Sequence, residues 1–137
     1  GRARQGSIRS PQWTHGGVAL GPKPRDYSYR INKKLRRLAI VSALSSKAQS
    51  GDMIVIDKIE CNDYKTKTMV NMLAALGAPK KAMIVLPEVD KKVQKSAANI
   101  AGVTTAQAYQ VNTYTVLNAG KFVVSVDAAK KLEEVFA

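Results

Sequence analysis

The sequence predicts a three-layer α/β fold with a mostly parallel sheet, preceded by an extended basic arm. Two observations support this prediction. After residue 51, short apolar runs alternate with stretches of helical periodicity, an order typical of parallel strands joined by right-handed helical crossovers. Before residue 30 no apolar period of either a strand or a helix persists. At 137 residues the chain fits one domain with a hydrophobic core.

Residues 1–29 form the predicted arm, and residues 30–137 form the predicted α/β domain. The arm holds five of the nine glycines and three of the five prolines, which favour irregular and extended backbone. Its apolar side chains are too few to build a core, so alone in water we expect the arm to be disordered. Because the first residue is Gly rather than Met, we expect a processed or truncated product.

A helix is predicted from residue 32 to about residue 49. Asn32 is a suitable N-cap, and Gly51 is a suitable residue just beyond the C-terminal end. Apolar side chains recur every three or four residues, at Leu35, Leu38, Val41, Leu44 and Ala48. The first two turns also carry four cations, which oppose the helix dipole. Because these cations are unfavourable for the helix itself, we expect that they bind an anionic partner.

Strands and helices alternate through the rest of the chain. The predicted strands are residues 53–57, 82–86, 103–109 and 121–126, and the first of them is expected to be buried. The predicted helices are residues 66–76, 90–100, 113–118 and 127–136, with Asp90 and Asp127 as N-caps of the second and the last. Gly77-Ala78-Pro79, Gly102 and Gly120 are expected to end the first three. Together these elements predict a Rossmann-like domain.

Positive charge is concentrated in the first 37 residues. Ten Lys or Arg there face one acid, Asp26, for a net charge of +9, whereas the other hundred residues carry 12 basic and 9 acidic side chains, a net of +3. Such asymmetry indicates a polyanionic partner, nucleic acid first and an anionic membrane surface second. Membrane binding lacks sequence support, because there is no basic amphipathic helix with a large apolar face and no run approaching about 18 apolar residues.

No motif supports catalysis, a metal site or a bound cofactor. Gly16 and Gly21 have the spacing of a phosphate-binding loop, but no Lys followed by Ser or Thr completes it and no strand precedes it. No Gly-x-Gly-x-x-Gly is present. His15 and Cys61 are the only histidine and cysteine, so there is no internal disulfide and no His/Cys metal set.

An enzymatic alternative involves three acids that follow the first strand: Asp57, Glu60 and Asp63. The carboxyl end of a parallel strand is where α/β domains often bind ligands, so these acids are candidates for an acid/base pair or a cation site. A solvated loop is the simpler interpretation, and we predict that the protein is not an enzyme.

We expect the arm and the start of the first helix to bind RNA. Arginine side chains suit phosphates and stack on bases, and aromatic side chains between them offer stacking surfaces. No helix-turn-helix or zinc finger is present for a DNA groove. The candidate RNA-binding residues are Arg2, Arg4, Arg9, Trp13, His15, Lys23, Arg25, Arg30, Lys33, Lys34, Arg36 and Arg37.

The arm also carries motifs of a known family. Residues 1–4 (GRAR), 10–13 (SPQW), 16–18 (GGV), 21–29 (GPKPRDYSY) and 33–34 (KK) closely resemble the central segment of bacterial-type large-subunit ribosomal protein L-four. The likeness continues to the last helix. It implies a cytoplasmic protein of the ribosome, or of an organellar ribosome, whose partners are large-subunit ribosomal RNA and neighbouring ribosomal proteins, and which supports subunit assembly.

The resemblance further implies an internal loop that threads into ribosomal RNA and helps to line the peptide exit tunnel. Gly1 then falls on the returning limb of that loop, and no residue of this chain can be assigned to the tunnel-lining tip. Many relatives have proline where this chain has Asn32, which is still a good helix starter. Some family members repress their own operon, so binding to a messenger leader through the same basic surface is the alternative function.

Overall fold

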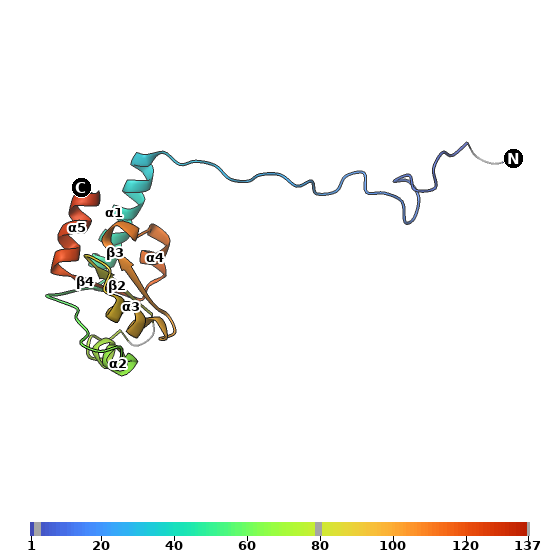
Figure 1. Ribbon diagram of the computed structural model, residues 1–137. Coiled ribbons are helices and arrows are strands. Elements are labelled where there is room, and N and C mark those ends of the chain that lie inside the picture. Colours follow the sequence, from blue (N-terminus) through green and yellow to red (C-terminus); the bar gives the residue numbers. More distant parts are fainter. Residues whose placement is uncertain (2–3, 79–80, 137) are drawn as a thin grey trace. The chain divides into compact units, whose positions relative to one another are not determined.

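The computed structural model describes residues 1, 4–78 and 81–136. Internal contacts divide the chain into two units, Gly1–Arg30 and Ile31–Ala137. Each unit is considered by itself. The second unit contains every helix and strand that the structure describes (Figure 1).

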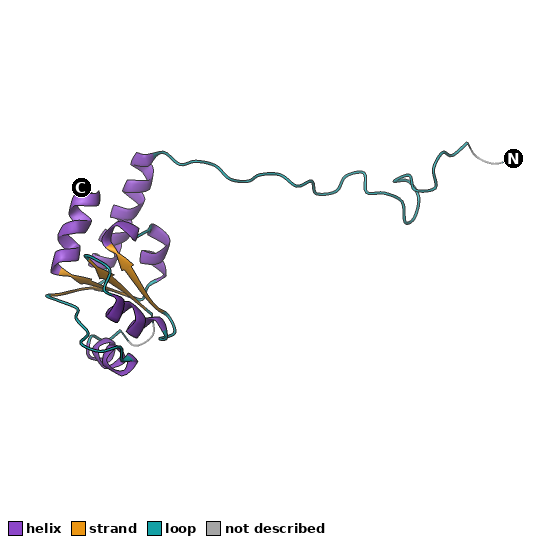
Figure 2. Ribbon diagram, in the orientation of Figure 1, coloured by secondary structure: helices purple, strands orange, loops and turns teal. Residues whose placement is uncertain are grey.

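The second unit is built on a four-stranded parallel sheet (Figure 2). Its strands are β1 (Met53–Ile56), β2 (Ala82–Leu86), β3 (Val103–Gln107) and β4 (Lys121–Ser125), in the order β1-β4-β2-β3. The last strand in the chain therefore lies between the first two, where Phe122 pairs with Met53 on one side and with Met83 on the other. The predicted α/β class with a parallel sheet is confirmed.

Helices cover both faces of the sheet. On one face, α2 (Thr66–Ala75) and α3 (Lys91–Ala98) contribute Met69, Leu73 and Val93 to a core that also contains Ile84 and Val123. On the other face, α1 (Lys33–Gln49), α4 (Thr113–Asn118) and α5 (Val126–Phe136) enclose a second core. Side chains alternate between these cores along β2 and β4, because successive strand residues point to opposite faces. This makes three layers.

The first strand is an edge strand, which corrects the prediction that residues 53–57 are buried. β1 ends at Ile56, and Val55 is 55% exposed, whereas Ile84 and Val85 of the central β2 are fully buried. Apolar composition did not distinguish the two positions in the sheet. The difference arises because β4 and β2 each have a strand on both sides, and β1 has one only.

Helix α1 begins and ends where predicted, but its apolar stripe is only partly used. Asn32 occupies the N-cap position without a side-chain capping bond, and Gly51 follows the C-terminal end with a positive φ of 70°. Ala43 is the buried residue of this helix, while Leu35 and Leu38 are 55% and 63% exposed. Helical periodicity was therefore a correct guide to secondary structure and an incomplete guide to burial.

The predicted caps of the other helices had different outcomes. Asp90 Oδ1 accepts the backbone N–H groups of Lys92, at 2.8 Å, and of Val93, at 3.4 Å, as predicted for α3. The prediction that Asp127 caps the last helix is wrong, because α5 begins at Val126. Ser125 Oγ instead accepts the N–H of Ala128 at 3.3 Å. Asp127 lies within the first turn, where a negative charge favours the helix dipole.

Two further boundaries differ from prediction. β3 ends at Gln107, and a short 3₁₀ helix η1 (Ala108–Gln110) follows where the strand was expected to continue. α3 ends at Ala98 rather than at residue 100, so Gly102, with a φ of 80°, lies in the turn before β3 and does not itself end the helix. Gly77, with a φ of 67°, directly follows the C-cap of α2 as predicted, and Pro79 lies outside the described residues. Gly120 does not take a positive φ; a Cβ there would lie 3.0 Å from the Lys81 carbonyl oxygen. Close backbone approach, rather than helix termination, therefore requires glycine at 120.

Candidate nucleic-acid interface

The arm exposes its basic side chains. Among its described residues, 1 and 4–30, none is buried, and Arg4, Arg9, Lys23, Arg25 and Arg30 are all exposed. Arg2, the remaining basic residue predicted to contact RNA, lies outside the described residues. Asp26 is the single acid of the arm. The charge that the arm presents to its surroundings is therefore predominantly positive.

A folded turn interrupts the extended arm at residues 7–17, here called the knuckle. Backbone hydrogen bonds join Ser10 N to Ser7 O at 3.2 Å, Trp13 N to Ser10 O at 3.0 Å, and Gly16 N to Trp13 O at 2.9 Å. Gly17 N then reaches back to Arg9 O at 2.9 Å. Glycine and proline content predicted irregular backbone without indicating this local structure. Residues 21–32 carry neither helix nor strand.

Gly16 is the residue on which the knuckle depends most directly. A Cβ on Gly16 would lie 2.0 Å from the Ser10 carbonyl oxygen and 2.9 Å from the Trp13 carbonyl oxygen. No side chain fits there without movement of the backbone. Its neighbour His15 has a φ of 63°, a left-handed conformation that is uncommon for a residue other than glycine.

The knuckle presents two of the predicted contact residues. Trp13 is 43% exposed and the His15 side chain is exposed. Further along the arm, Tyr27 and Tyr29 are 73% and 83% exposed. They offer flat surfaces on which unpaired bases can stack.

Residues 25–28 form a second ordered feature. The Arg25 guanidinium carbon lies 4.3 Å from the centre of the Tyr27 ring, in cation–π contact. Between them, Asp26 Oδ1 accepts the backbone N–H of Ser28 and Oδ2 accepts its hydroxyl, both at 2.8 Å. The backbone bond from Ser28, followed by the hydroxyl bond, lowers the pKa of Asp26. The arm's one acid is thus engaged by its own turn.

The helix entrance comprises Lys33, Lys34, Arg36 and Arg37, all of which are exposed on the first two turns of α1. Arg37 differs from the other three, because its Nε donates a hydrogen bond of 2.8 Å to the backbone carbonyl of Phe136 at the end of α5. Arg37 was predicted to contact RNA, and in the structure it also connects α1 to the end of α5. Sequence spacing could not reveal a contact between residues 99 positions apart.

The acidic alternative receives little structural support. Glu60 pairs with Lys58 at 3.8 Å, and Asp63 pairs with Lys65 at 2.9 Å, all on exposed side chains. Asp57 and Glu60 line the same surface hollow, together with Asp127. Within residues 1, 4–78 and 81–136, no group of three or more His, Cys, Asp or Glu side chains is arranged to hold a metal ion.

Cys61 is buried, and burial, followed by the nearby charge of Asp90, raises the pKa of its thiol. A raised pKa reduces the thiolate fraction that a nucleophile needs.

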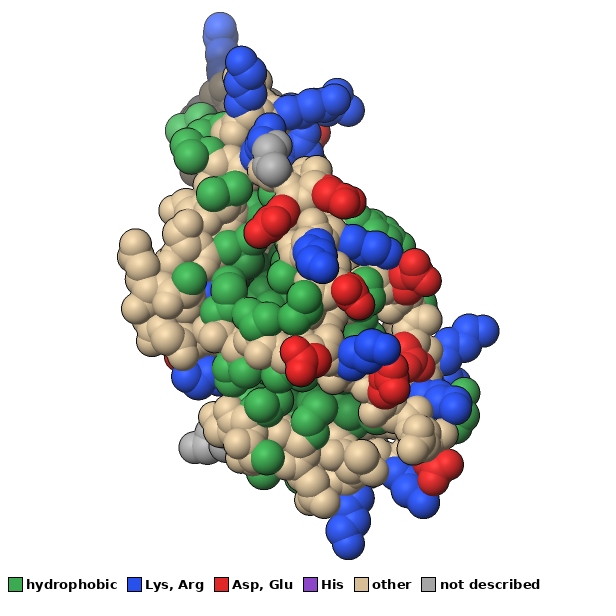
Figure 3. Space-filling model, turned by 90° about the vertical axis from the view of Figure 1, so that its left-hand side faces the viewer, with side chains coloured by type: hydrophobic (Ala, Val, Ile, Leu, Met, Phe, Trp, Pro, Cys, Tyr) green, Lys and Arg blue, Asp and Glu red, His purple; other side chains and the backbone are tan. Residues whose placement is uncertain are grey.

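On the α5 side of the domain, acidic and basic side chains are interspersed over apolar ones (Figure 3). This mixed surface contrasts with the single sign of charge along the arm. Among the described helices, none is long and apolar enough to cross a membrane.

Comparison with known proteins gives the same interpretation as the arm motifs. The family model described as ribosomal protein L4/L1 family matches residues 1–135. The chain belongs to this family. A relative named large ribosomal subunit protein uL4, from Alkaliphilus oremlandii, is 53% identical over 137 residues. Proteins of the same name from Clostridium acetobutylicum and Thermoanaerobacter pseudethanolicus are 51% and 50% identical over 137 residues.

These matches cover the whole of this chain and 66% of each relative. The chain thus spans slightly less than two thirds of the length of these family members. The resemblance inferred from the arm motifs is confirmed. The ordered features of the arm, namely the knuckle and the contacts of residues 25–28, were missed by sequence reasoning. The Asp-x-Ser spacing of Asp26 and Ser28 was the one local signal that could have indicated the second of them.

Proposed function

We propose that this protein is a structural constituent of the large ribosomal subunit that binds ribosomal RNA through its arm and helix entrance. The observation that carries this proposal is the exposed, predominantly positive charge of the arm, since 1–30 holds six basic residues and one acid. Family membership supports it, because the relatives are named as large-subunit proteins. On the face of the domain seen in Figure 3, acidic and basic side chains are interspersed and form no patch of positive charge alone.

The arm would bind by phosphate contact and stacking. Arg4, Arg9 and Arg30 have no acidic side chain in the arm to pair with except Asp26, which is occupied by Ser28. Guanidinium groups can hold phosphate oxygens with two parallel hydrogen bonds. Trp13 and the Arg25–Tyr27 pair would pack on bases or sugars. Arg2, Lys23 and His15 complete the proposed arm contacts.

The helix entrance would bring a phosphate to the start of α1. Asn32 makes no side-chain capping bond, so the first backbone N–H groups of the helix are not capped by that side chain. Helix N-termini attract anions through these N–H groups and the helix dipole. Lys33, Lys34 and Arg36 surround the same turn. A bound phosphate would accept hydrogen bonds from the uncapped N–H groups. It would also offset the repulsion between the cations and the positive end of the helix dipole.

A salt titration tests the proposal. If about six to ten phosphates are neutralised, the logarithm of the affinity for large-subunit RNA should fall with the logarithm of salt concentration, with a slope of roughly −4 to −7. Filter binding with the full chain measures this slope. A flat salt dependence would show that phosphate neutralisation is not the basis of binding.

A charge-matched pair of variants locates the surface. Replacing Arg4, Arg9 and Arg30 with Gln should flatten the slope by about two units, at roughly 0.7 per phosphate lost. The control replaces Lys58, Lys65 and Lys67 with Gln, which removes the same charge from the domain. Equal losses for both variants would indicate a general charge effect and would contradict a site on the arm.

The alternative function is binding to the protein's own messenger leader through the same side chains. The exposed residues serve either RNA, so competition separates them: labelled ribosomal RNA is challenged with unlabelled leader RNA. Displacement of the ribosomal RNA by an equal concentration of leader RNA would favour a repressor role. If the leader RNA displaces none of it, only the ribosomal role is supported. The same proposal includes three further roles. The protein would support the peptide exit tunnel region, would contact neighbouring ribosomal proteins, and would be located in cytoplasmic or organellar ribosomes.

A further inference from the structure

A pocket lies at the carboxyl ends of β2 and β3. The chain leaves β2 toward α3 on one face of the sheet, and it leaves β3 toward η1 and α4, of which α4 packs on the other face. When the segments that follow two adjacent strands pass to opposite faces of the sheet, a crevice forms at the carboxyl ends of those strands. α/β domains commonly bind ligands in such a crevice. The pocket occupies this crevice and encloses about 110 Å³.

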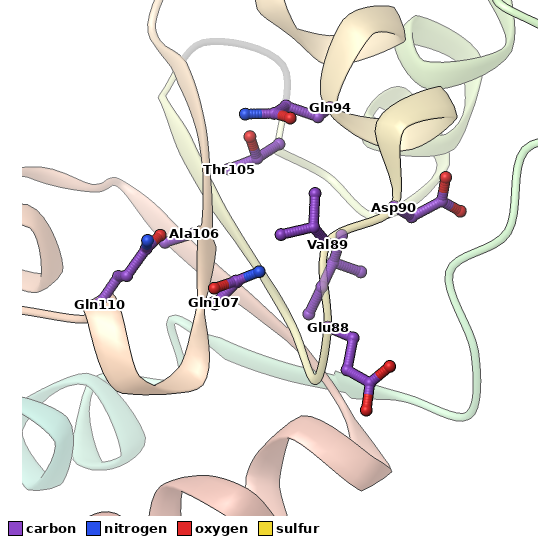
Figure 4. Close-up of a pocket in the computed structure, with 9 residues that line it drawn as sticks. Glu88, Val89, Asp90, Gln94, Thr105, Ala106, Gln107 and Gln110 are labelled. Atoms are coloured by element: carbon purple, nitrogen blue, oxygen red, sulfur yellow. The ribbon is translucent and has the colours of Figure 1, made fainter.

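The pocket combines apolar walls with neutral polar groups. Leu86, Val89 and Ala106 supply apolar surface. Thr105 contributes a hydroxyl, and the side-chain amides come from α3, β3 and η1, at Gln94, Gln107 and Gln110 (Figure 4). Side-chain amides from three elements line the pocket together with the carboxylates of Glu88 and Asp90, so its wall offers both hydrogen-bond donors and acceptors.

Gln107 is the central polar residue of the pocket. It is 8% exposed, and its Oε1 has no hydrogen-bond partner among the described residues. Figure 4 shows its amide nitrogen turned toward the side of the pocket where Val89 lies. Buried amides in proteins are nearly always hydrogen-bonded. A bound group that offers a donor and an acceptor side by side would satisfy this amide after rotation about its last torsion.

The two acids at the rim are already engaged. Glu88 Oε1 pairs with Lys131 Nζ at 3.1 Å. Asp90 Oδ1 accepts the Lys92 N–H at 2.8 Å as the cap of α3. Each carboxylate thus has one oxygen engaged. The buried side-chain atom of the pocket that lacks a partner among the described residues is Gln107 Oε1, so the unmet hydrogen-bonding capacity is that of a neutral amide.

We propose that this pocket holds one unpaired nucleobase of the bound RNA. A base is flat, and its two faces can pack against apolar walls. Its edge carries adjacent hydrogen-bond donors and acceptors, to which amide side chains can form hydrogen bonds. Unpaired bases turned out of their strand are the usual targets of sequence-specific RNA recognition. The inference rests on the proposed RNA-binding function and adds a base-reading site on the domain to the phosphate contacts of the arm.

Titration of the labelled full chain with each of the four ribonucleosides tests the pocket by NMR. Nucleosides lack phosphate, so the charge of the arm contributes little and failure here is distinct from failure of the salt titration. We expect side-chain amide shifts at Gln94 and Gln107, with one nucleoside binding more tightly than the others. Gln107→Met, which keeps length and removes the amide, should weaken that binding by about tenfold or more.

The matched control is Gln49→Met, at the exposed end of α1, which should bind like the parent. Gln94→Met provides a second pocket variant at an exposed position, in case Gln107→Met does not fold. Absence of pocket shifts with every nucleoside, or equal binding by parent and both pocket variants, overturns the proposal. Equal shifts with N-acetylglutamine amide would also overturn it, because the pocket would then recognise a protein amide instead of a base.

Discussion

Arg37 and Phe136 join the first helix of the domain to the last. The Arg37 Nε donates a 2.8 Å hydrogen bond to the Phe136 carbonyl, and a cation at the C-terminal end of a helix is also favoured by the helix dipole. Arg37→Ala should lower the free energy of unfolding by about 1 kcal/mol, measured by urea denaturation. Arg36→Ala, one residue earlier and exposed, should change it by less than about 0.5 kcal/mol. Equal stability of the two variants would contradict a structural role for Arg37.

The knuckle should matter for RNA and not for the stability of the domain. Gly16→Ala places a methyl group where the Ser10 carbonyl lies, so the turn must open. We expect RNA affinity to fall several-fold while the melting temperature of the domain is unchanged, because the described arm residues are not part of either core. Gly6→Ala is the control, since nothing lies within 4 Å of its added Cβ. If both variants bind RNA like the parent, the knuckle is not a binding element.

Position in the sheet should set the cost of truncating a strand residue. Phe122 of β4 is fully buried, and Phe122→Ala should destabilise the domain by about 3–5 kcal/mol. Val55 of the edge strand β1 is 55% exposed, so Val55→Ala should cost less than about 1 kcal/mol. Thermal or urea unfolding measures both. A large cost at Val55 would mean that the edge of β1 is covered in solution.

Asp52 should make stability depend on acid. Lys121 Nζ donates to its Oδ1 at 2.9 Å and Ser50 Oγ donates to its Oδ2 at 2.9 Å. The bond from Lys121, followed by that from Ser50, lowers the pKa of Asp52 in the folded protein. Its contribution is therefore fully present above the unfolded pKa of about 3.9 and is lost as pH falls through the lower folded value.

Asp52→Asn tests this dependence. The variant should unfold with a shallower loss of stability below about pH 4 than the parent, in urea titrations at a series of pH values. Asp57→Asn is the matched control, since that carboxylate lies on the exposed hollow at the other end of β1. An unchanged acid profile in Asp52→Asn would show that the contact with Lys121 does not persist in solution.

Much of the domain could be predicted because its signals are local. The Val- and Ile-rich run at residues 82–86 and the cap at Asp90 depend on neighbours only a few positions away. The positive φ at Gly51 and Gly77, each just beyond a helix C-cap, follows from the same kind of local requirement. The charge of the arm is likewise a property of composition. These features need no knowledge of which strands pair.

Several features that the sequence did not reveal depend on distant segments. Strand order left Val55 at an edge and brought Gly120 against Lys81. It also assembled the amides of Gln94, Gln107 and Gln110 around one pocket. Each requires a choice among several pairings that have similar local preferences, and only the summed burial of both cores decides that choice.

Periodicity, caps and charge are properties of short stretches of chain, and they were enough to predict an α/β domain with a basic arm. The turn of the arm at Gly16, the hydrogen bond from Arg37 to Phe136 and the capping of α5 by Ser125 rather than Asp127 could be seen only in the structure. These are contacts between particular atoms. Their geometry follows from backbone closure and packing, which composition and spacing do not encode.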